Sequence, residues 1–165
     1  MTVTQQAAGG LPRGFVGLAA SHRLRSEPEK ALAVVSSGRV PWANGMVERP
    51  SVAGLRRYLV DLRLRLGAED AAVTTFRKAA YLDLGPPRRT DDGWELDISW
   101  RAANAAPLFP VFAGRLAIEG DAMKIEGIYA PPGGVVGRVA DRVLLHVAAN
   151  ATARWLLDQI DRAAA

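Results

Sequence analysis

The residues in this sequence that could carry chemistry are few, and the two histidines are the first to consider. His22 and His146 lie far apart in the chain, and there is no cysteine. A zinc site built on histidine needs three or four convergent ligands, and the metalloprotease motif HExxH is missing from the sequence. Without cysteine, disulfides and thiolate catalysis are excluded. The sequence therefore predicts no metal and no cofactor.

Motifs for nucleophiles and for phosphate binding are also missing. There is no G-x-S-x-G sequence to form a nucleophile elbow. The stretch PPGGVVG (131–137) matches neither the dinucleotide fingerprint nor the phosphate loop. Its Pro-Pro-Gly-Gly start favours a turn between a strand and a helix. We therefore assign no catalytic residue from motifs.

His146 is the polar side chain with the most interesting surroundings, because Asn150 follows it by one helical turn. Together with Arg115 and Tyr129 on predicted strands, these residues could line a cavity and hold the polar end of a ligand. They could also act on a ligand by general acid–base catalysis. Alternatively, they are surface residues that bond to a sheet edge or to solvent. The sequence leaves these interpretations open.

Alternating hydrophobicity predicts the strands that would position these residues. A period of two is typical of a sheet with one buried face and one wet face. Five consecutive segments are predicted as strands, namely 57–67, 73–89, 90–102, 109–120 and 122–132. Because short turns join them, we expect antiparallel neighbours. Residues 14–24 are a weaker candidate for an opening strand, and 40–54 are predicted to be irregular.

Two segments are predicted to be helical. The first is 26–38, with Ser26 as N-cap, Glu29 three residues later as in a capping box, and Pro28 in the first turn. The second is 135–162, which would be roughly 40 Å long. Thr152 is expected on its polar side. Its predicted apolar stripe contains Val136, Val139, Ala140, Val143, Leu144, Val147, Ala151 and Trp155.

The order of these elements resembles that of the START-like, or birch-pollen-allergen-like, superfamily, also called the SRPBCC or polyketide-cyclase-like helix-grip fold. The resemblance covers residues 14–163. It is carried by SHRLRSEPEKALAVVSS (21–37), PWANGMV (41–47) and GIYAPPGGVVGRVADRVLLHVAANATARWLL (127–157). It implies an α+β fold in which a curved antiparallel sheet wraps around a long C-terminal helix, with a short helix after the first strand. It also implies a cavity for a hydrophobic ligand, and it implies no common catalytic residue.

Composition and charge limit the classes of partner that we expect for this protein. The chain has 165 residues, of which 49% are hydrophobic, and a formal net charge of +4. The basic residues are scattered rather than clustered with aromatics, so we expect no nucleic acid. There is no apolar run of the ~18 residues that a membrane span needs, and no secretory pattern, so we expect a cytoplasmic protein. Residues 1–12 are predicted to be a flexible leader and 13–165 a single domain.

These patterns predict the binding of a hydrophobic small molecule, such as a lipid, a polyketide or another polycyclic compound, between the sheet and the last helix. One alternative is an enzyme of the cyclase, aromatase or dehydratase kind that uses polar residues of the cavity. Another is a protein-interaction module whose core is filled. The predicted lining of the cavity consists of Trp94, Leu96, Ile98, Trp100, Phe112, Arg115, Leu116, Tyr129, Val139, Val143, His146, Val147 and Asn150.

Overall fold

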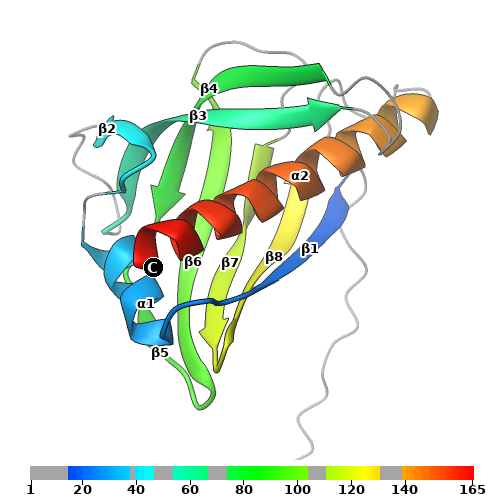
Figure 1. Cartoon of the computed structure of the whole chain (residues 1–165). Helices are drawn as coiled ribbons and strands as arrows, with labels where there is room; N and C mark the ends of the chain where they lie inside the picture. The colour runs from blue at the N-terminus through cyan, green and yellow to red at the C-terminus, as the bar shows by residue number, and fades with distance from the viewer. Residues whose placement is uncertain (1–14, 38–39, 47–53, 67–73, 104–110, 131–138) are drawn as a thin grey trace, which may run out of the picture.

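A long helix lies across the concave face of a curved antiparallel sheet (Figure 1). The computed structural model describes residues 15–37, 40–46, 54–66, 74–103, 111–130 and 139–165. Within these ranges the side chains of 44–46, 63–66, 74–78 and 139–145 are outside the description. The elements are β1 (Val16–Arg23), α1 (Pro28–Ser36), β2 (Ala43–Met46), β3 (Arg56–Leu66), β4 (Thr74–Leu84), β5 (Arg88–Arg89), β6 (Gly93–Ala102), β7 (Val111–Glu119), β8 (Ala122–Ala130) and α2 (Val139–Ala164).

The strands pair in the order β1-β8-β7-β6-β4-β3-β2, and β5 pairs with β6. Every pairing is antiparallel, as the short predicted turns require. The predicted fold class is therefore confirmed, including the short helix after the first strand. One detail is different: β2 lies within the stretch 40–54 that was predicted to be irregular.

The side of each strand that faces the helix is the side that the alternation predicts. In β3, Tyr58, Val60 and Leu62 are almost completely buried, whereas Asp61 is exposed. The central and later strands bury Leu96, Ile98, Trp100, Phe112, Leu116, Ile118, Met123, Ile125 and Tyr129 in the same way. Burial of this apolar surface is the main stabilising contribution to the fold.

Helix α2 approaches the sheet most closely at β1 and β3, and it also packs against α1. In Figure 1 it crosses the concave face obliquely and ends beside α1. Its buried residues in the described part are Ala148, Ala149, Thr152, Ala153, Leu156, Leu157, Ile160, Asp161 and Ala164. None of the described helices is both long and apolar enough to cross a membrane.

The apolar stripe predicted for α2 is wrong at Val147 and at Thr152, whereas Val136, Val139, Ala140, Val143 and Leu144 of that stripe lie outside the described side chains. Val147 is 42% exposed, whereas Thr152, predicted on the polar side, is fully buried and donates a hydrogen bond to the Ala148 carbonyl. Val147 was predicted to face inward. Instead, alanines face the sheet because small side chains allow the two backbones to approach closely. The leucines and the isoleucine near the C-terminal end fix this orientation.

The predicted capping box of α1 is also absent. Glu27 occupies the N-cap position without a side-chain cap bond, and the Ser26 hydroxyl is buried without a partner in the described structure. Pro28 does begin the helix as predicted. The other end is held by Arg56, whose guanidinium donates to the carbonyls of Val35 and Ser36 at 2.7 and 2.6 Å. A cation at this end satisfies carbonyls that have no partner within the helix.

Strands β7 and β8 approach closely at one glycine pair. Gly114 lies directly opposite Gly127. A Cβ on Gly127 would lie 2.4 Å from the Ala113 carbonyl oxygen and 2.8 Å from the ring of Phe112. The two positions therefore exclude any larger residue, and the space above them is occupied by the Phe112 ring.

Candidate functional site

One row of side chains runs across the concave face of the sheet and defines the candidate site. The register pairs Tyr58 with Leu82, Leu82 with Trp100, Trp100 with Phe112, and Phe112 with Tyr129. These five positions share one face because directly opposite residues in a sheet point the same way. The row contains four aromatic residues, and each member is at most 1% exposed. We call these five residues the aromatic row.

The centre of the aromatic row is a stacked pair of rings. The centroids of Trp100 and Phe112 lie 4.0 Å apart, with an interplanar angle of 18°. Stacked aromatic pairs contribute about 0.5–1.5 kcal/mol beyond the burial of their area. Since Phe112 is also held over the glycine pair, its ring has a fixed position. The pair therefore forms a rigid apolar part of the core beneath α2.

At the β8 end of the aromatic row, Tyr129 meets polar residues of α2. The Tyr129 hydroxyl lies 3.4 Å from His146 Nδ1, and Asn150 Nδ2 lies 2.9 Å from His146 Nε2. Asn150 Nδ2 also donates to the His146 carbonyl at 3.1 Å. An amide nitrogen only donates, so Nε2 accepts and a neutral His146 carries its proton on Nδ1. The imidazole then donates to Tyr129, whose own proton stays available to another acceptor.

Burial raises the pKa of Tyr129 above its ordinary value. The hydroxyl consequently stays protonated at neutral pH and can donate. The two partners are much more accessible than Tyr129, because His146 is exposed and Asn150 is half-buried. The chain from Asn150 through His146 to Tyr129 thus leads from the surface to the buried aromatic row.

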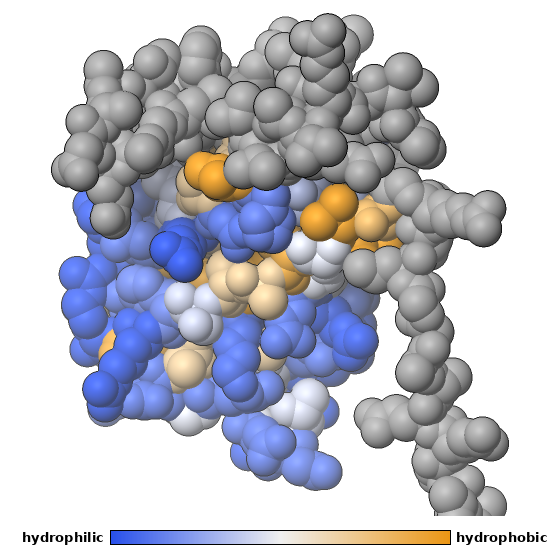
Figure 2. Space-filling model, turned by 90° about the vertical axis from the view of Figure 1, so that its right-hand side faces the viewer, coloured by the Kyte–Doolittle hydropathy of each residue, from blue (hydrophilic) through white to orange (hydrophobic). Residues whose placement is uncertain are grey.

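A pocket opens where this polar chain reaches the surface. It has a volume of about 500 Å³ and lies where β1, β8 and α2 meet. Its lining consists of Gly17, Leu18, Ala19, Glu126, Gly127, His146 and Asn150. The small residues of β1 leave this space beside the helix. Figure 2 shows the molecule from this side, with hydrophobic residues gathered in the upper and middle part of the described surface.

Comparison with solved structures shows that this chain shares its fold with proteins of low sequence identity. No protein-family model matches the sequence, and neither does any curated protein. The crystal structure of Ara h 8.0201 superposes on 92% of this chain and 98% of its own, with a TM-score of 0.50 and 11% identity. The chain has the helix-grip fold. The resemblance of the sequence to the helix-grip superfamily is therefore confirmed at the level of the fold.

Two further structures are similar to this helix-grip protein with lower TM-scores. A STAR-related lipid transfer protein from Xanthomonas axonopodis has a TM-score of 0.42 and 10% identity, over 92% of this chain and 89% of its own. DynU16, from the dynemicin biosynthetic locus, has a TM-score of 0.41 and 14% identity, and this chain spans 47% of its length.

The predicted lining residues lie in different parts of the fold and differ in how deeply they are buried. Six of them lie buried on the face toward the helix, namely Leu96, Ile98, Trp100, Phe112, Leu116 and Tyr129. Trp94 lies on the same face but is half-buried, at the opposite end of β6, beside the guanidinium of Arg89. His146 and Asn150 line the pocket. The side chains of Val139 and Val143 lie outside the described residues.

Two of the predicted lining residues do not face the interior. Val147 lies on the exposed side of α2. Arg115 lies on the outer face of the sheet, because in β7 it alternates with the buried Leu116. There it pairs with Glu95 at 3.3 Å and lines a second hollow of about 440 Å³. Charged residues of both signs surround this outer hollow, so it differs from the apolar interior.

Tyr58 and Leu82 belong to the aromatic row, but sequence reasoning did not select them as site residues. Tyr58 was placed on the buried side of its strand, and this placement was the one available signal. The link between β3 and the central strands depends on long-range register, which local periodicity does not contain.

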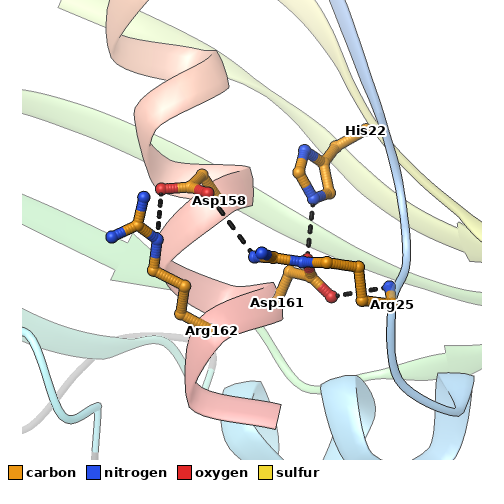
Figure 3. Close-up of polar contacts among 5 residues, drawn as sticks. All are labelled: His22, Arg25, Asp158, Asp161 and Arg162. Atoms are coloured by element: carbon orange, nitrogen blue, oxygen red, sulfur yellow. Dashed lines mark hydrogen bonds and ion pairs between the residues drawn. The ribbon is translucent and has the colours of Figure 1, made fainter. Parts of the chain in front are cut away.

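The buried carboxylate of Asp161 attaches the C-terminal part of α2 to β1 and to the segment before α1 (Figure 3). Asp161 of α2 is fully buried and accepts hydrogen bonds from His22 Nε2 at 2.9 Å, from the Arg25 backbone N–H at 2.9 Å and from Arg25 Nε at 2.6 Å. Burial opposes ionisation of this carboxyl, but the bonds from His22 and Arg25 lower its pKa to about 2. Asp158 pairs with Arg162 at 2.8 Å and also with Arg25 Nη2 at 3.7 Å, so it belongs to the same cluster.

The Asp161 cluster has a structural role in this arrangement. It ties α2 to β1 and to the segment before α1, so it fixes the helix against the sheet. The described residues contain no group of histidine and acidic side chains that could hold a metal ion.

Proposed function

We propose that this protein binds a hydrophobic small molecule, such as a lipid or a polycyclic compound, between the aromatic row and helix α2. The observation that carries this proposal is the pocket between β1, β8 and α2, which adjoins the Tyr129 end of the aromatic row. A mostly apolar site with a few polar groups is the usual arrangement for small-molecule binding. The helix-grip fold supports the proposal only as a scaffold, because fold does not determine function.

The rigid centre of the site suits a flat or chain-like apolar ligand. The stacked Trp100 and Phe112 rings are apolar but at most 1% exposed, so a ligand would reach them only by moving α2 away from the sheet. The partly exposed His146 and Asn150 would then lie at the entrance and meet the ligand first.

Binding of Nile red, an apolar dye whose fluorescence depends on polarity, tests this proposal. Asn150 lines the pocket, whereas Arg154, one turn later on α2, is exposed and is not part of its lining. We expect the variant Asn150→Trp to weaken dye binding at least about fivefold by filling the entrance, and the matched control Arg154→Trp to bind as the wild type does. Equal affinity of both variants, or no binding to the wild type, would contradict the proposal and favour a protein-interaction module with a filled core.

The contact between His146 and Tyr129 favours a second candidate, an enzyme of the cyclase, aromatase or dehydratase kind. A protonated buried hydroxyl next to an exposed imidazole is a suitable pair for moving a proton. Native mass spectrometry would identify a compound that co-purifies with the protein, and that compound would serve as the substrate for the test. Conversion by the wild type and not by a folded His146→Ala variant would support the enzyme. Retained binding without conversion by either protein would support the carrier.

A further inference from the structure

Two polar atoms of the aromatic row lack a protein partner in the described structure. The hydroxyl of Tyr58 and the indole Nε1 of Trp100 are buried and make no hydrogen bond. Each of the two residues is only 1% exposed. Buried polar groups almost always have partners, so each exception requires an explanation. Ser26 and Trp42 have unpaired buried atoms as well, but they lie on the segments that flank α1.

The register brings the two donors to the same part of the concave face. Tyr58 and Trp100 both lie opposite Leu82, one on each side of β4. Since neighbouring strands are about 4.8 Å apart, their Cα atoms are about 10 Å apart. Both side chains rise from a curved sheet toward its concave side, which brings their ends closer together than their backbones. The two donors therefore face the same part of the concave side.

The chemistry of the donors restricts what that group can be. An indole N–H can only donate, so its partner must present an acceptor. A charged acceptor would need a cation, because burial of an unpaired carboxylate is costly. The nearest cation on this face of β3 is Arg56, and its two terminal nitrogens already bond to the carbonyls of Val35 and Ser36. A neutral oxygen with two lone pairs fits better.

We infer that the ligand of the proposed site carries a neutral carbonyl oxygen, as in a ketone, ester or amide, and that this oxygen accepts hydrogen bonds from Tyr58 and Trp100. The apolar remainder of the ligand then lies along the stacked rings of Trp100 and Phe112. This inference rests on the proposed function and specifies the polar group that the site recognises.

A pair of flat tricyclic probes that differ in one carbonyl tests the inference. Fluorenone has the ketone oxygen, fluorene lacks it, and fluorene carboxylate has a charged acceptor instead. Calorimetric titration of the full chain measures the affinity for each probe. The variants Tyr58→Phe and Trp100→Phe each remove one donor but keep an aromatic ring. The control Trp94→Phe makes the same change six residues before Trp100, about 20 Å along β6.

We expect the wild type to bind fluorenone more tightly than fluorene or fluorene carboxylate. Each donor variant should weaken fluorenone binding about five- to tenfold, as expected for one lost hydrogen bond, and leave fluorene binding unchanged. Trp94→Phe should change neither affinity. Equal wild-type affinity for fluorenone and fluorene would overturn the carbonyl inference while the proposed function stands. Equal weakening of both probes by a donor variant would also overturn it. No binding of any probe would overturn both proposals.

Discussion

Replacement of Asp161 by asparagine should destabilise the protein substantially at neutral pH. The carboxylate is fully buried, and three donors from His22 and Arg25 surround it. Asparagine has almost the same shape but no charge, and its amide nitrogen would face donors rather than acceptors. The loss should exceed that of an ordinary surface ion pair, which contributes about 0–1 kcal/mol.

The magnitude follows from the pKa of Asp161. In the unfolded chain an aspartate has a pKa of about 3.9, whereas in the folded protein the pKa is about 2. Because one pH unit corresponds to 1.36 kcal/mol, the ionised carboxylate contributes about 2.5 kcal/mol to the folding free energy at neutral pH. For a protein of this size, Asp161→Asn should lower Tm by about 5–10 °C.

The pH dependence supplies a second signature. Since the folded pKa lies below the unfolded one, the stabilisation is fully present above about pH 4 and is lost as the pH falls toward 2. Thermal unfolding followed by circular dichroism between pH 7 and 2 should show this loss in the wild type and much less of it in Asp161→Asn. Asp121→Asn is the matched control, since its ion pair with Arg23 is exposed on both sides and lies outside the Asp161 cluster. A variant Asp161→Asn with the Tm and acid sensitivity of the wild type would refute this reasoning.

Three further predictions concern the sheet. Tyr58→Phe should leave the unliganded protein equally stable or stabilise it by about 1 kcal/mol in urea denaturation, because it removes a buried hydroxyl without a partner; a clear loss of stability would mean that the hydroxyl is bonded. Gly127→Ala should lower the free energy of unfolding by about 2 kcal/mol or more in the same assay, because its Cβ would lie 2.4 Å from the Ala113 carbonyl oxygen. An unchanged midpoint of urea denaturation would contradict that close approach. Burial raises the pKa of Tyr129, so stability should fall as the pH rises above about 10 in the wild type, and Tyr129→Phe should reduce this fall; equal alkaline sensitivity would count against the burial.

Much of the fold could be predicted because one face of each strand is buried. That requirement places Tyr58, Val60 and Leu62 on one side of β3 and exposes Asp61, and the alternation is visible in the sequence. The long C-terminal helix could be predicted for a similar reason, since its segment lacks proline. The rotation of α2 could not, because its small residues pack inward at a close contact that only the folded backbone defines.

The candidate site was less predictable than the fold. Arg115 was selected for its chemical type, although its place between the buried Phe112 and Leu116 in the alternation already favours the outer face. The sequence shows Asn150 one helical turn after His146, and in the structure this spacing brings the two side chains into contact. The aromatic row was not, because it depends on the pairing of strands that are distant in sequence.

The most direct test of the account is the response of the four tryptophan indole N–H signals to a ligand in solution. Each indole N–H gives one signal in a heteronuclear NMR spectrum of nitrogen-labelled protein, and Trp→Phe variants assign these signals. Addition of fluorenone should shift the Trp100 signal most, because that indole lies in the aromatic row without a partner, and should leave Trp94 nearly unchanged. A Trp100 signal that stays in place at saturating fluorenone would contradict the claim that the space between the sheet and α2 admits a ligand.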